Sequence, residues 1–430
     1  MKISIKKTIF IALVIIVLCS IGLGLYFGLG KTDNGQEGGD NDNPVQGPES
    51  LPFEYALIND IEGNSCYSIT NMNIDCSENG ILTIPESYNG LPIIGIASLN
   101  KEKLDDNNTY NTNITEIRIP KSVKFFDGYT FMGMTGLTKV VFEQGNNITE
   151  IPTCAFKNCF SLSTIENLDN ITKIETQAFY NCSSLLEFNF SEKVDFIEAT
   201  AFVGCTSLTS FSVHLDNPVF CSIDGVIFNK QGTGLLNYPQ GKTETAYVVP
   251  DLATEIMGYA IYGNKYLKEI DLNNVVMIRR YGLAECSNLS MITTNNLDFL
   301  ELDALEGTSW LQNQTTEIIK LGNVLVSYTG TESELEITGI MSIAPRAFAG
   351  NKTLQKITLN EAGYLRNIGA EAFCGCDNLR EVYLLGNNIV YVSSTTFDKN
   401  SNLKIYVPYP LLQQYLNNQI WQAYNTMLQA

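Results

Sequence analysis

The sequence ITKIETQAFYNCSSLLEFNF (residues 171–190) is followed by a second copy, VDFIEATAFVGCTSLTSFSV (residues 194–213). Aligned without a gap, Phe179 matches Phe202, and the offset, 202 − 179, is 23. The same offset matches four further pairs: Ile174 with Ile197, Cys182 with Cys205, Leu185 with Leu208 and Phe188 with Phe211. A fixed period of about 20 to 30 residues, with apolar residues at one phase, is typical of a stacked solenoid.

The phase of Phe179 recurs along most of the chain. Its positions are Phe131, Phe156, Phe179, Phe202, Ile261, Leu283, Leu305, Phe348, Phe373 and Phe397. Two intervals are long, and we explain them by hairpin insertions at 215–250 and 310–338. Their turns are predicted at Asp224-Gly225 and Gly322-Asn323, since such pairs favour tight hairpin turns. The sequence thus predicts about ten stacked units.

Each standard copy is predicted to contain three pieces. ITKI forms a first strand, Ala178-Phe179 lies in one turn of helix, and Leu185 to Phe190 forms a second strand. The phenylalanines are interpreted as core, and so are the cysteines three residues later, because a free thiol behaves as a small apolar group. These cysteines are Cys159, Cys182, Cys205, Cys286 and Cys376. Occasional disulfides between neighbouring copies, and a Cys66–Cys76 bridge, are alternatives to free thiols.

The N-terminal region is predicted to anchor the chain in a membrane. Residues 8–30 are uncharged and long enough to span about 30 Å of hydrocarbon as a helix. Lysines in residues 1–7 predict a short cytoplasmic tail, with the rest of the chain outside. A cleaved signal peptide is the alternative, in which case the protein is secreted. Residues 31–52 have almost no apolar side chain and are interpreted as a flexible linker.

Both ends of the repeat array are predicted to be capped, because an uncovered solenoid end exposes its core. Residues 53–105 form an N-terminal cap and the first repeat, with a hairpin turn at 88–90. The repeats occupy 106–405, and 406–430 form the C-terminal cap, with helical apolar spacing from Leu411 to Leu428.

Charge and composition argue against several functions. Lys plus Arg number 27 against 46 Asp plus Glu, so the net charge is 27 − 46 = −19. Nucleic acid is excluded as a partner, since binding it requires a basic face. His214 is the only histidine, and no CxxC pair or phosphate-binding glycine loop occurs. We therefore predict no catalytic residue, no cofactor and no metal site.

The repeat unit resembles that of the BspA-like leucine-rich-repeat family. The pattern xxIxxxAFxxCxxLxxI matches at Ile174 to Phe188 and at Ile368 to Val382. The insertion at Ser222 to Phe228 and the ending at Ile405 to Pro408 with Trp421 are also similar to that family. The resemblance covers about residues 67–430 and implies a curved leucine-rich-repeat array, β-rich α/β in class. It also implies a class of surface proteins that includes adhesins, without catalytic residues.

Three copies depart from the family pattern. Those at Ile261, Leu283 and Leu305 lack the phenylalanine, and Asn264 and Thr308 replace the cysteine in two of them. Stacking is expected to be less regular there.

Strand alternation predicts an outward surface on the second strand of each copy. Successive copies should place their outward side chains in two rows: Thr164/Glu166, Glu187/Asn189, Ser210/Ser212, Glu269/Asp271, Met291/Thr293, Lys356/Thr358 and Glu381/Tyr383. These rows are either a binding face or a merely solvated one. Solenoids commonly bind partners on such sheets.

The sequence thus predicts a membrane-anchored, single-pass, cell-surface protein. Its leucine-rich repeats bind a macromolecular partner, most simply a protein, in the manner of an adhesin and without catalysis. A self-associating surface-coat protein and a secreted carbohydrate-active enzyme are the alternatives.

Overall fold

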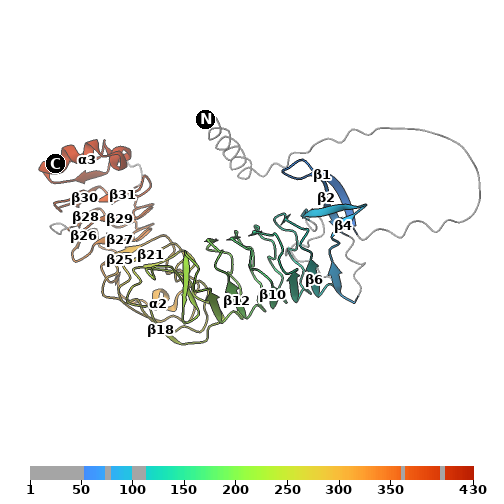
Figure 1. The fold of residues 1–430 in the computed structure, drawn as a ribbon. Helices are drawn as coiled ribbons and strands as arrows, with labels where there is room; N and C mark the ends of the chain where they lie inside the picture. The colour runs from blue at the N-terminus through green and yellow to red at the C-terminus, as the bar shows by residue number, and fades with distance from the viewer. Residues whose placement is uncertain (1–52, 73–78, 99–112, 360–363, 398–401) are drawn as a thin grey trace, which may run out of the picture. The chain divides into compact units, whose positions relative to one another are not determined.

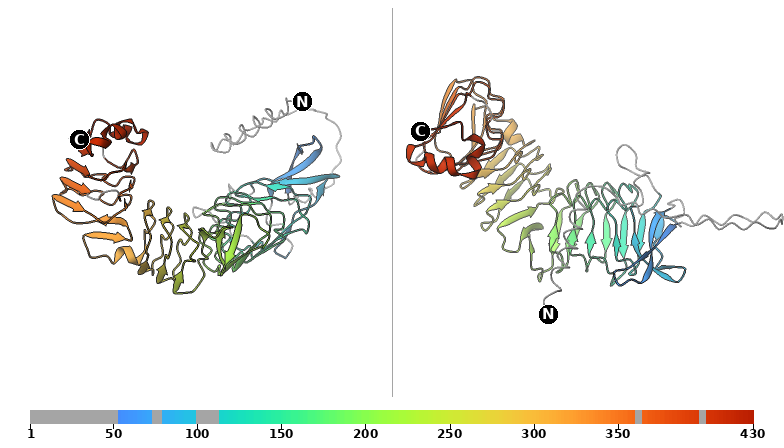
Figure 2. Two further views of the ribbon diagram at one scale, coloured as in Figure 1. Left: turned by 60° about the vertical axis from the view of Figure 1, so that its left-hand side comes forward. Right: turned by 90° about the horizontal axis from the view of Figure 1, so that it is seen from above.

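The computed structural model describes residues 53–72, 79–98, 113–359, 364–397 and 402–430. Contacts divide the chain into Met1–Ser50 and Leu51–Ala430, and all described residues belong to the second unit (Figure 1). The predicted tail, anchor and linker (1–7, 8–30 and 31–52) lie outside these ranges, as does Cys76. The unit is a solenoid of stacked coils in chain order (Figure 2), which confirms the predicted repeat architecture.

The first strands of the coils are short and pair in parallel with their neighbours, in sheets that also include the antiparallel strands of the two insertions. One sheet joins β9 (Glu150–Ile151), β11 (Lys173–Ile174) and β13 (Phe196–Ile197). A second contains β15 (Phe220–Ile223), β16 (Val226–Asn229), β17 (Gly234–Asn237), β19 (Glu255–Ile256), β21 (Met277–Ile278) and β23 (Phe299–Leu300). A third contains β24 (Ile318–Leu321), β25 (Val324–Tyr328), β27 (Ser342–Ile343), β29 (Asn367–Ile368) and β31 (Tyr391–Val392).

The second strands also pair in parallel, but in four separate sheets. The first contains β3 (Ile81–Thr83), β6 (Glu116–Ile119), β8 (Lys139–Phe142) and β10 (Thr164–Glu166). The next two are β12 (Glu187–Phe190) with β14 (Ser210–Val213), and β18 (Ala246–Val248) with β20 (Glu269–Asp271) and β22 (Met291–Thr293). The fourth contains β26 (Glu334–Ile337), β28 (Lys356–Leu359), β30 (Glu381–Leu384), β32 (Lys404–Tyr406) and β33 (Leu428–Gln429).

The predicted helical turn around Phe179 is wrong. Ala178, Tyr180 and Cys182 donate their N–H groups locally, to carbonyls three residues earlier, whereas Phe179 and Asn181 donate to Ala201 and Val203 of the next coil, at 2.9 and 2.8 Å. An α-helix uses every N–H locally, so this alternation cannot be helical. Gln177 and Asn181 also have φ of +54° and +61°, which interrupts any helix.

These two left-handed positions recur with the repeat, two residues before and two residues after the Phe179 phase. Glycine or asparagine occupies most of the later positions, including Asn158, Gly263 and Gly350. Larger residues, including Tyr259 and Arg346, occupy the earlier ones at φ of +59°. Each of these two donates its N–H to the next coil, to Arg280 and Ala370, and the hydrogen bond offsets part of the backbone strain.

Burial confirms the prediction that the residues in phase with Phe179 form the core. All ten positions are at most 4% exposed, and the rings of Phe131, Phe156, Phe179 and Phe202 stack with centroids 5.4 to 5.5 Å apart. A second run stacks Phe348, Phe373 and Phe397 at 4.8 and 5.2 Å. The five phase cysteines are buried, as the core interpretation predicts, and Cys159, Cys182, Cys205 and Cys286 are free thiols.

Those thiols also form a ladder that the sequence did not reveal. Each Sγ donates to the carbonyl of the phase residue in the preceding coil; Cys182 Sγ lies 3.2 Å from Phe156 O, and Cys286 Sγ lies 2.8 Å from Ile261 O. The bond is weak and adds to an existing one, since Phe156 O also accepts from Cys159 N at 3.1 Å.

Stacking stays regular at Ile261, Leu283 and Leu305, contrary to expectation. β19, β21 and β23 pair in constant register, Glu255 with Met277 and Met277 with Phe299. Regularity survives because the backbone bonds between coils do not depend on an aromatic ring. Asn264, which stands where other coils have the cysteine, also makes more hydrogen bonds than a thiol does. Its side-chain amide donates to three carbonyls of the preceding coil and accepts from two backbone N–H groups.

Both long intervals contain antiparallel hairpins with turns at the predicted residues. Asp224 and Gly225 have φ of +51° and +79° between β15 and β16, and Gly322 has φ of +56° between β24 and β25. The second interval also contains the short helix α2 (Ser309–Gln312), which Thr308 caps.

The N-terminal strands form a sheet that continues into the array. β1 (Phe53–Asn59) pairs antiparallel with β2 (Ser65–Met72), which pairs in parallel with β5 (Leu91–Ile96). β4 (Ser87–Tyr88) forms the hairpin with β5 across the turn at residues 89 and 90. β7 (Phe125–Phe126) then pairs with β5 and links this sheet to the coils.

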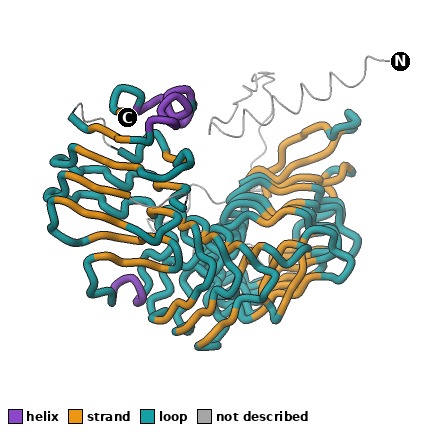
Figure 3. Tube along the Cα trace, turned by 90° about the vertical axis from the view of Figure 1, so that its left-hand side faces the viewer, coloured by secondary structure: helices purple, strands orange, loops and turns teal. Residues whose placement is uncertain are grey.

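The C-terminal segment is helical but not one continuous helix. It comprises the 3-10 helix η2 (Tyr409–Leu411), α3 (Leu412–Asn417) and the 3-10 helix η3 (Gln419–Tyr424), with an extended residue at Asn418 (Figure 3). The break lets Trp421 turn inward, where its Nε1 donates to Val390 O at 2.7 Å and its side chain is fully buried. Ile420, within the segment predicted to have helical apolar spacing, is 39% exposed.

Candidate functional site

The outward side chains of the second strands are the candidate site, and strand alternation places them as predicted. In β12, Glu187 and Asn189 are exposed while Phe188 and Phe190 are buried. Exposed positions are Thr164, Glu187, Asn189, Ser212 and Glu269; half-buried positions are Glu166, Ser210, Asp271, Lys356, Thr358, Glu381 and Tyr383. The core therefore fixes which side chains face outward.

The structure brings these residues together in groups rather than in two unbroken rows. Parallel pairing sets Glu187 beside Ser210 and Asn189 beside Ser212. Glu269 and Asp271 lie beside Met291 and Thr293, and Lys356 and Thr358 lie beside Glu381 and Tyr383. Thr164 and Glu166 pair instead with Lys139 and Val141 of β8. Three breaks separate the four sheets, because the backbone ladder between second strands is interrupted there.

The groups differ in charge and chemistry. Glu166 forms an ion pair with Lys139 at 2.7 Å, so its carboxylate is already partnered. In β28 and β30, Lys356 pairs with Glu334 at 3.1 Å and lies 5.7 Å from the centre of the Tyr383 ring. Tyr383 stacks on Tyr406 at 4.5 Å and donates to Glu381 at 3.0 Å. Partial burial and the Glu381 carboxylate raise the pKa of Tyr383.

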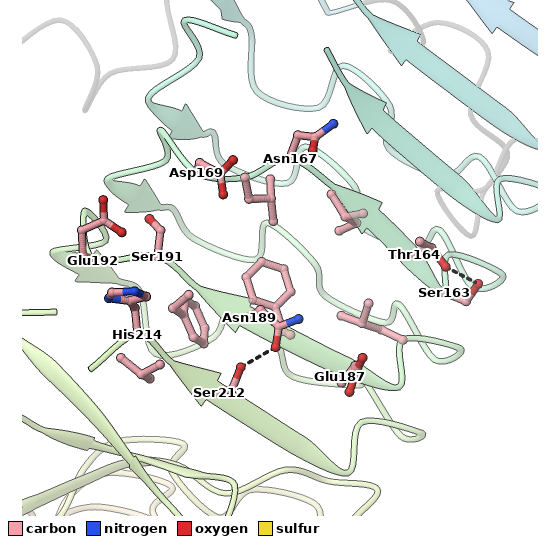
Figure 4. A pocket seen from close by; sticks show the side chains of 16 residues that line it. Ser163, Thr164, Asn167, Asp169, Glu187, Asn189, Ser191, Glu192, Ser212 and His214 are labelled. Atoms are coloured by element: carbon pink, nitrogen blue, oxygen red, sulfur yellow. Dashed lines mark hydrogen bonds between the residues drawn. The ribbon is translucent and has the colours of Figure 1, made fainter. Parts of the chain in front are cut away.

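In the pair β12 and β14, the charge of Glu187 is not balanced by a basic side chain of either strand. Neither strand contains a lysine or arginine that could pair with Glu187, and Asn189 accepts a hydrogen bond from the Ser212 hydroxyl. Beside this pair, toward β10, lies a groove of about 530 Å³ (Figure 4). Four of the predicted residues line it: Thr164, Glu187, Asn189 and Ser212.

A single residue explains why the groove exists. Asn167 follows β10 at the position that Phe142 occupies in β8, and it aligns with Phe190 one repeat later. An inward phenylalanine is thus replaced by asparagine, whose φ is +65° and whose Nδ2 donates to Phe142 O at 2.6 Å. β10 ends at Glu166, and no strand pairing forms between β10 and β12.

Several groove residues were missed by sequence reasoning. Asp169, Glu192 and His214 stand on its rim, and Phe188 and Phe190, with half-buried Leu168, line its floor. The signal was present, since a polar Asn167 at an inward apolar phase is visible once the repeats are aligned. Asp169 and Glu192 lie one period apart (192 − 169 = 23), but both stand in loops at polar positions of the repeat, where spacing does not mark a residue as part of a groove.

The described ranges contain no group of three or more His, Cys, Asp or Glu side chains that could hold a metal ion. His214 is exposed and lies 3.9 Å from Asp216. Within those ranges, no helix is long and apolar enough to cross a bilayer.

Comparison with known proteins identifies the repeat. The profile of the BspA type leucine-rich-repeat region matches six copies over residues 102–230, 245–328 and 326–420, more than half of the chain. No match is found among curated protein sequences.

Several solved structures are similar to this chain. The pneumococcal vaccine antigen PcpA is 19% identical, with a TM-score of 0.50 over 88% of this chain and 96% of that one. A leucine-rich cell-surface protein from Faecalibacterium prausnitzii is 18% identical, with a TM-score of 0.40 over 82% and 92% of the two chains. A leucine-rich-repeat protein from Bacteroides ovatus is 19% identical, with a TM-score of 0.39 over 82% and 76%. On the repeats it contains, the chain belongs to the BspA-type leucine-rich-repeat family.

Proposed function

We propose that this protein is a membrane-anchored, cell-surface repeat protein that binds a protein partner, adhesin-like and without catalysis, through the outward side chains of its second strands. The observation that supports the proposal is the pairing of outward side chains in register, as for Glu187 with Ser210 and Asn189 with Ser212. A rigid core beneath these residues holds them at little entropic cost when a partner binds. Extended surfaces of stacked repeats commonly serve binding.

The proposed organisation follows the predicted boundaries. Residues 8–30 anchor the chain, 31–52 form a linker, and the repeats of 106–405 lie outside the cell between caps at 53–105 and 406–430. Cleavage of the N-terminal segment would convert the same binding module into a secreted one.

Protease treatment of intact cells tests the orientation. Protease should cut the Phe53–Ala430 region on intact cells that make the full-length chain, as it does on permeabilised cells. Cutting that requires permeabilisation would overturn the outward orientation.

Three carboxylates on different sheets allow a test of the binding face. Replacing Glu187, Glu269 and Glu381 together by glutamine should reduce partner capture by the full-length chain at least tenfold, with an unchanged melting temperature. The matched control replaces Glu150, Glu285 and Glu306, which are exposed outside the second strands, and changes the net charge equally. Equal capture by both triple variants would remove the binding site from this face.

A further inference from the structure

We propose that the groove between β10 and β12 receives an extended segment of the protein partner, which adds as a strand to the free edge of β12 and carries basic side chains. This inference rests on the proposed function and specifies how the partner is recognised.

The backbone of β12 has one open edge. Leu186 O and Phe190 O accept hydrogen bonds from Thr209 N and His214 N, each at 2.9 Å, so the main chain of these residues faces β14. Peptide groups of successive strand residues point to opposite edges of a parallel strand. The N–H and C=O groups of Glu187 and Asn189 therefore face the groove, where the described part of the chain supplies no pairing strand.

At the other two breaks, the chain itself contributes backbone hydrogen bonds. Between β14 and β18, the first hairpin supplies Gly225 O, which accepts from Phe211 N at 2.9 Å, and Gly241 N, which donates to Leu208 O at 2.8 Å. After β22, the segment of α2 supplies Trp310 N, which donates to Leu289 O at 2.6 Å. The hairpin thus supplies a partner to the strand backbone of β14, whereas the described residues supply no backbone hydrogen bond to Glu187 or Asn189 at the groove edge of β12. An added strand from a partner would supply the same hydrogen bonds.

The groove favours a strand with alternating apolar and basic side chains. Its floor contains Phe188 and Phe190, which suit apolar side chains. Its rim carries the carboxylates of Asp169, Glu187 and Glu192, and the described residues that line it include no lysine or arginine. A volume of about 530 Å³ lies within the range of about 300–1,000 Å³ typical of sites that bury a ligand. β12 has four residues, which sets the length over which a strand could pair.

The experiment measures binding of a dye-labelled, end-capped heptapeptide of alternating lysine and valine to the full-length chain, by fluorescence anisotropy at physiological salt. Asn189→Pro removes the N–H that faces the groove and no bond of the β12–β14 ladder, whereas Asn189→Ala keeps that N–H. Both variants lose the same side-chain bond to Ser212 and have the same charge. We expect Asn189→Pro to weaken binding at least tenfold and Asn189→Ala less than threefold.

Two further measurements keep the test decisive if Asn189→Pro disturbs folding. A glutamate–valine heptapeptide should bind at least tenfold more weakly than the lysine–valine one, and Asp169→Asn with Glu192→Gln should reduce that difference. Amide hydrogen exchange of Glu187 and Asn189, whose N–H groups face the groove, should slow when the lysine–valine peptide is added. Unchanged exchange, or equal binding by the two Asn189 variants, overturns strand addition.

The outcomes also separate this inference from the proposed function. If the glutamine triple variant loses the partner while Asn189→Pro keeps it, the binding face stands and strand addition fails. If the amides of Glu187 and Asn189 already exchange slowly without peptide, a segment of this chain fills the groove and the inference is wrong. If peptide binding depends on Asn189 but the triple variant keeps its partner, the groove stands and the proposed face fails.

Discussion

The stack of Phe156, Phe179 and Phe202 and the stack of Ile261, Leu283 and Leu305 occupy the same position of the coil with different side chains. The first packs rings at 5.5 and 5.4 Å, and the second packs branched aliphatic groups that are at most 4% exposed. Their backbones pair alike: Phe179 N lies 2.9 Å from Ala201 O, and Ile261 N lies 2.8 Å from Gly282 O. The backbone therefore defines the coil, and the side chain has only to be apolar and fill the space.

The position three residues later shows the same principle with polar groups. The aromatic stack is followed by the thiols of Cys159, Cys182 and Cys205, and the aliphatic stack by Asn264, Cys286 and Thr308. Each thiol makes one weak bond to the preceding coil, as Cys205 does to Phe179 O at 3.2 Å. The Asn264 side chain makes five hydrogen bonds, so its loss should be more costly.

The largest effect on the free energy of unfolding should come from removing one ring of the aromatic stack. Phe179→Ala removes a fully buried ring that is stacked on both sides, and should lower the free energy of unfolding by about 4 kcal/mol. Phe179→Leu converts that coil to the aliphatic type and should cost about 1 kcal/mol. Urea unfolding of the full-length chain measures both. Leu186→Ala, at a 57% exposed position, is the control. If Phe179→Ala lowers the free energy of unfolding no more than this control, the ring stack does not act as the core of the coil.

The second-largest effect should come from the position three residues after the Phe179 phase, where the two stacks carry different polar groups. Asn264→Ala leaves buried N–H and C=O groups without partners and should cost about 3 kcal/mol, because unsatisfied buried polar groups are expensive. Cys205→Ala removes one weak bond and a small volume, and should cost about 1 kcal/mol. The same unfolding measurement compares them, and equal losses would show that the five bonds of Asn264 contribute no more than one thiol.

The smallest effect should be a pH dependence confined to the thiol-bearing coils. Burial raises the pKa of Cys205 to about 12 from an ordinary 9.0. As the pH rises above 9, the unfolded thiol loses its proton first, so the free energy of unfolding falls until the folded thiol also titrates near 12. Each such thiol should remove about 1 kcal/mol between pH 9 and 10.

Cys205→Ala has no thiol to titrate at this position. The difference in free energy of unfolding between the natural protein and this variant should therefore shrink by about 1 kcal/mol between pH 9 and 10. The deficit of Asn264→Ala should not change for this reason, since no thiol is removed. Unfolding curves at pH 7, 9 and 10 provide the check, and a constant deficit for Cys205→Ala would contradict the burial argument.

Much of the fold could be predicted because the repeat is a local signal that is reinforced many times. The phase of Phe179, the buried cysteines, the turns at Asp224-Gly225 and Gly322-Asn323, and the outward direction of Glu187 all follow from spacing and residue type. The groove could be predicted only in part. Asn167 breaks an apolar phase, but the sequence does not show whether the neighbouring coils close over it or stay apart.

The sequence by itself determined the period, the core positions and which strand face looks outward, because these depend on residues a fixed distance apart along the chain. Only the tertiary structure decided that the turn is not helical, that stacking continues through Ile261, and that β12 keeps an open edge. In each case the outcome depends on which group, if any, pairs with a backbone N–H or C=O. That partner lies in the next coil, a full repeat away along the chain, and is available only where two coils approach closely enough to pair.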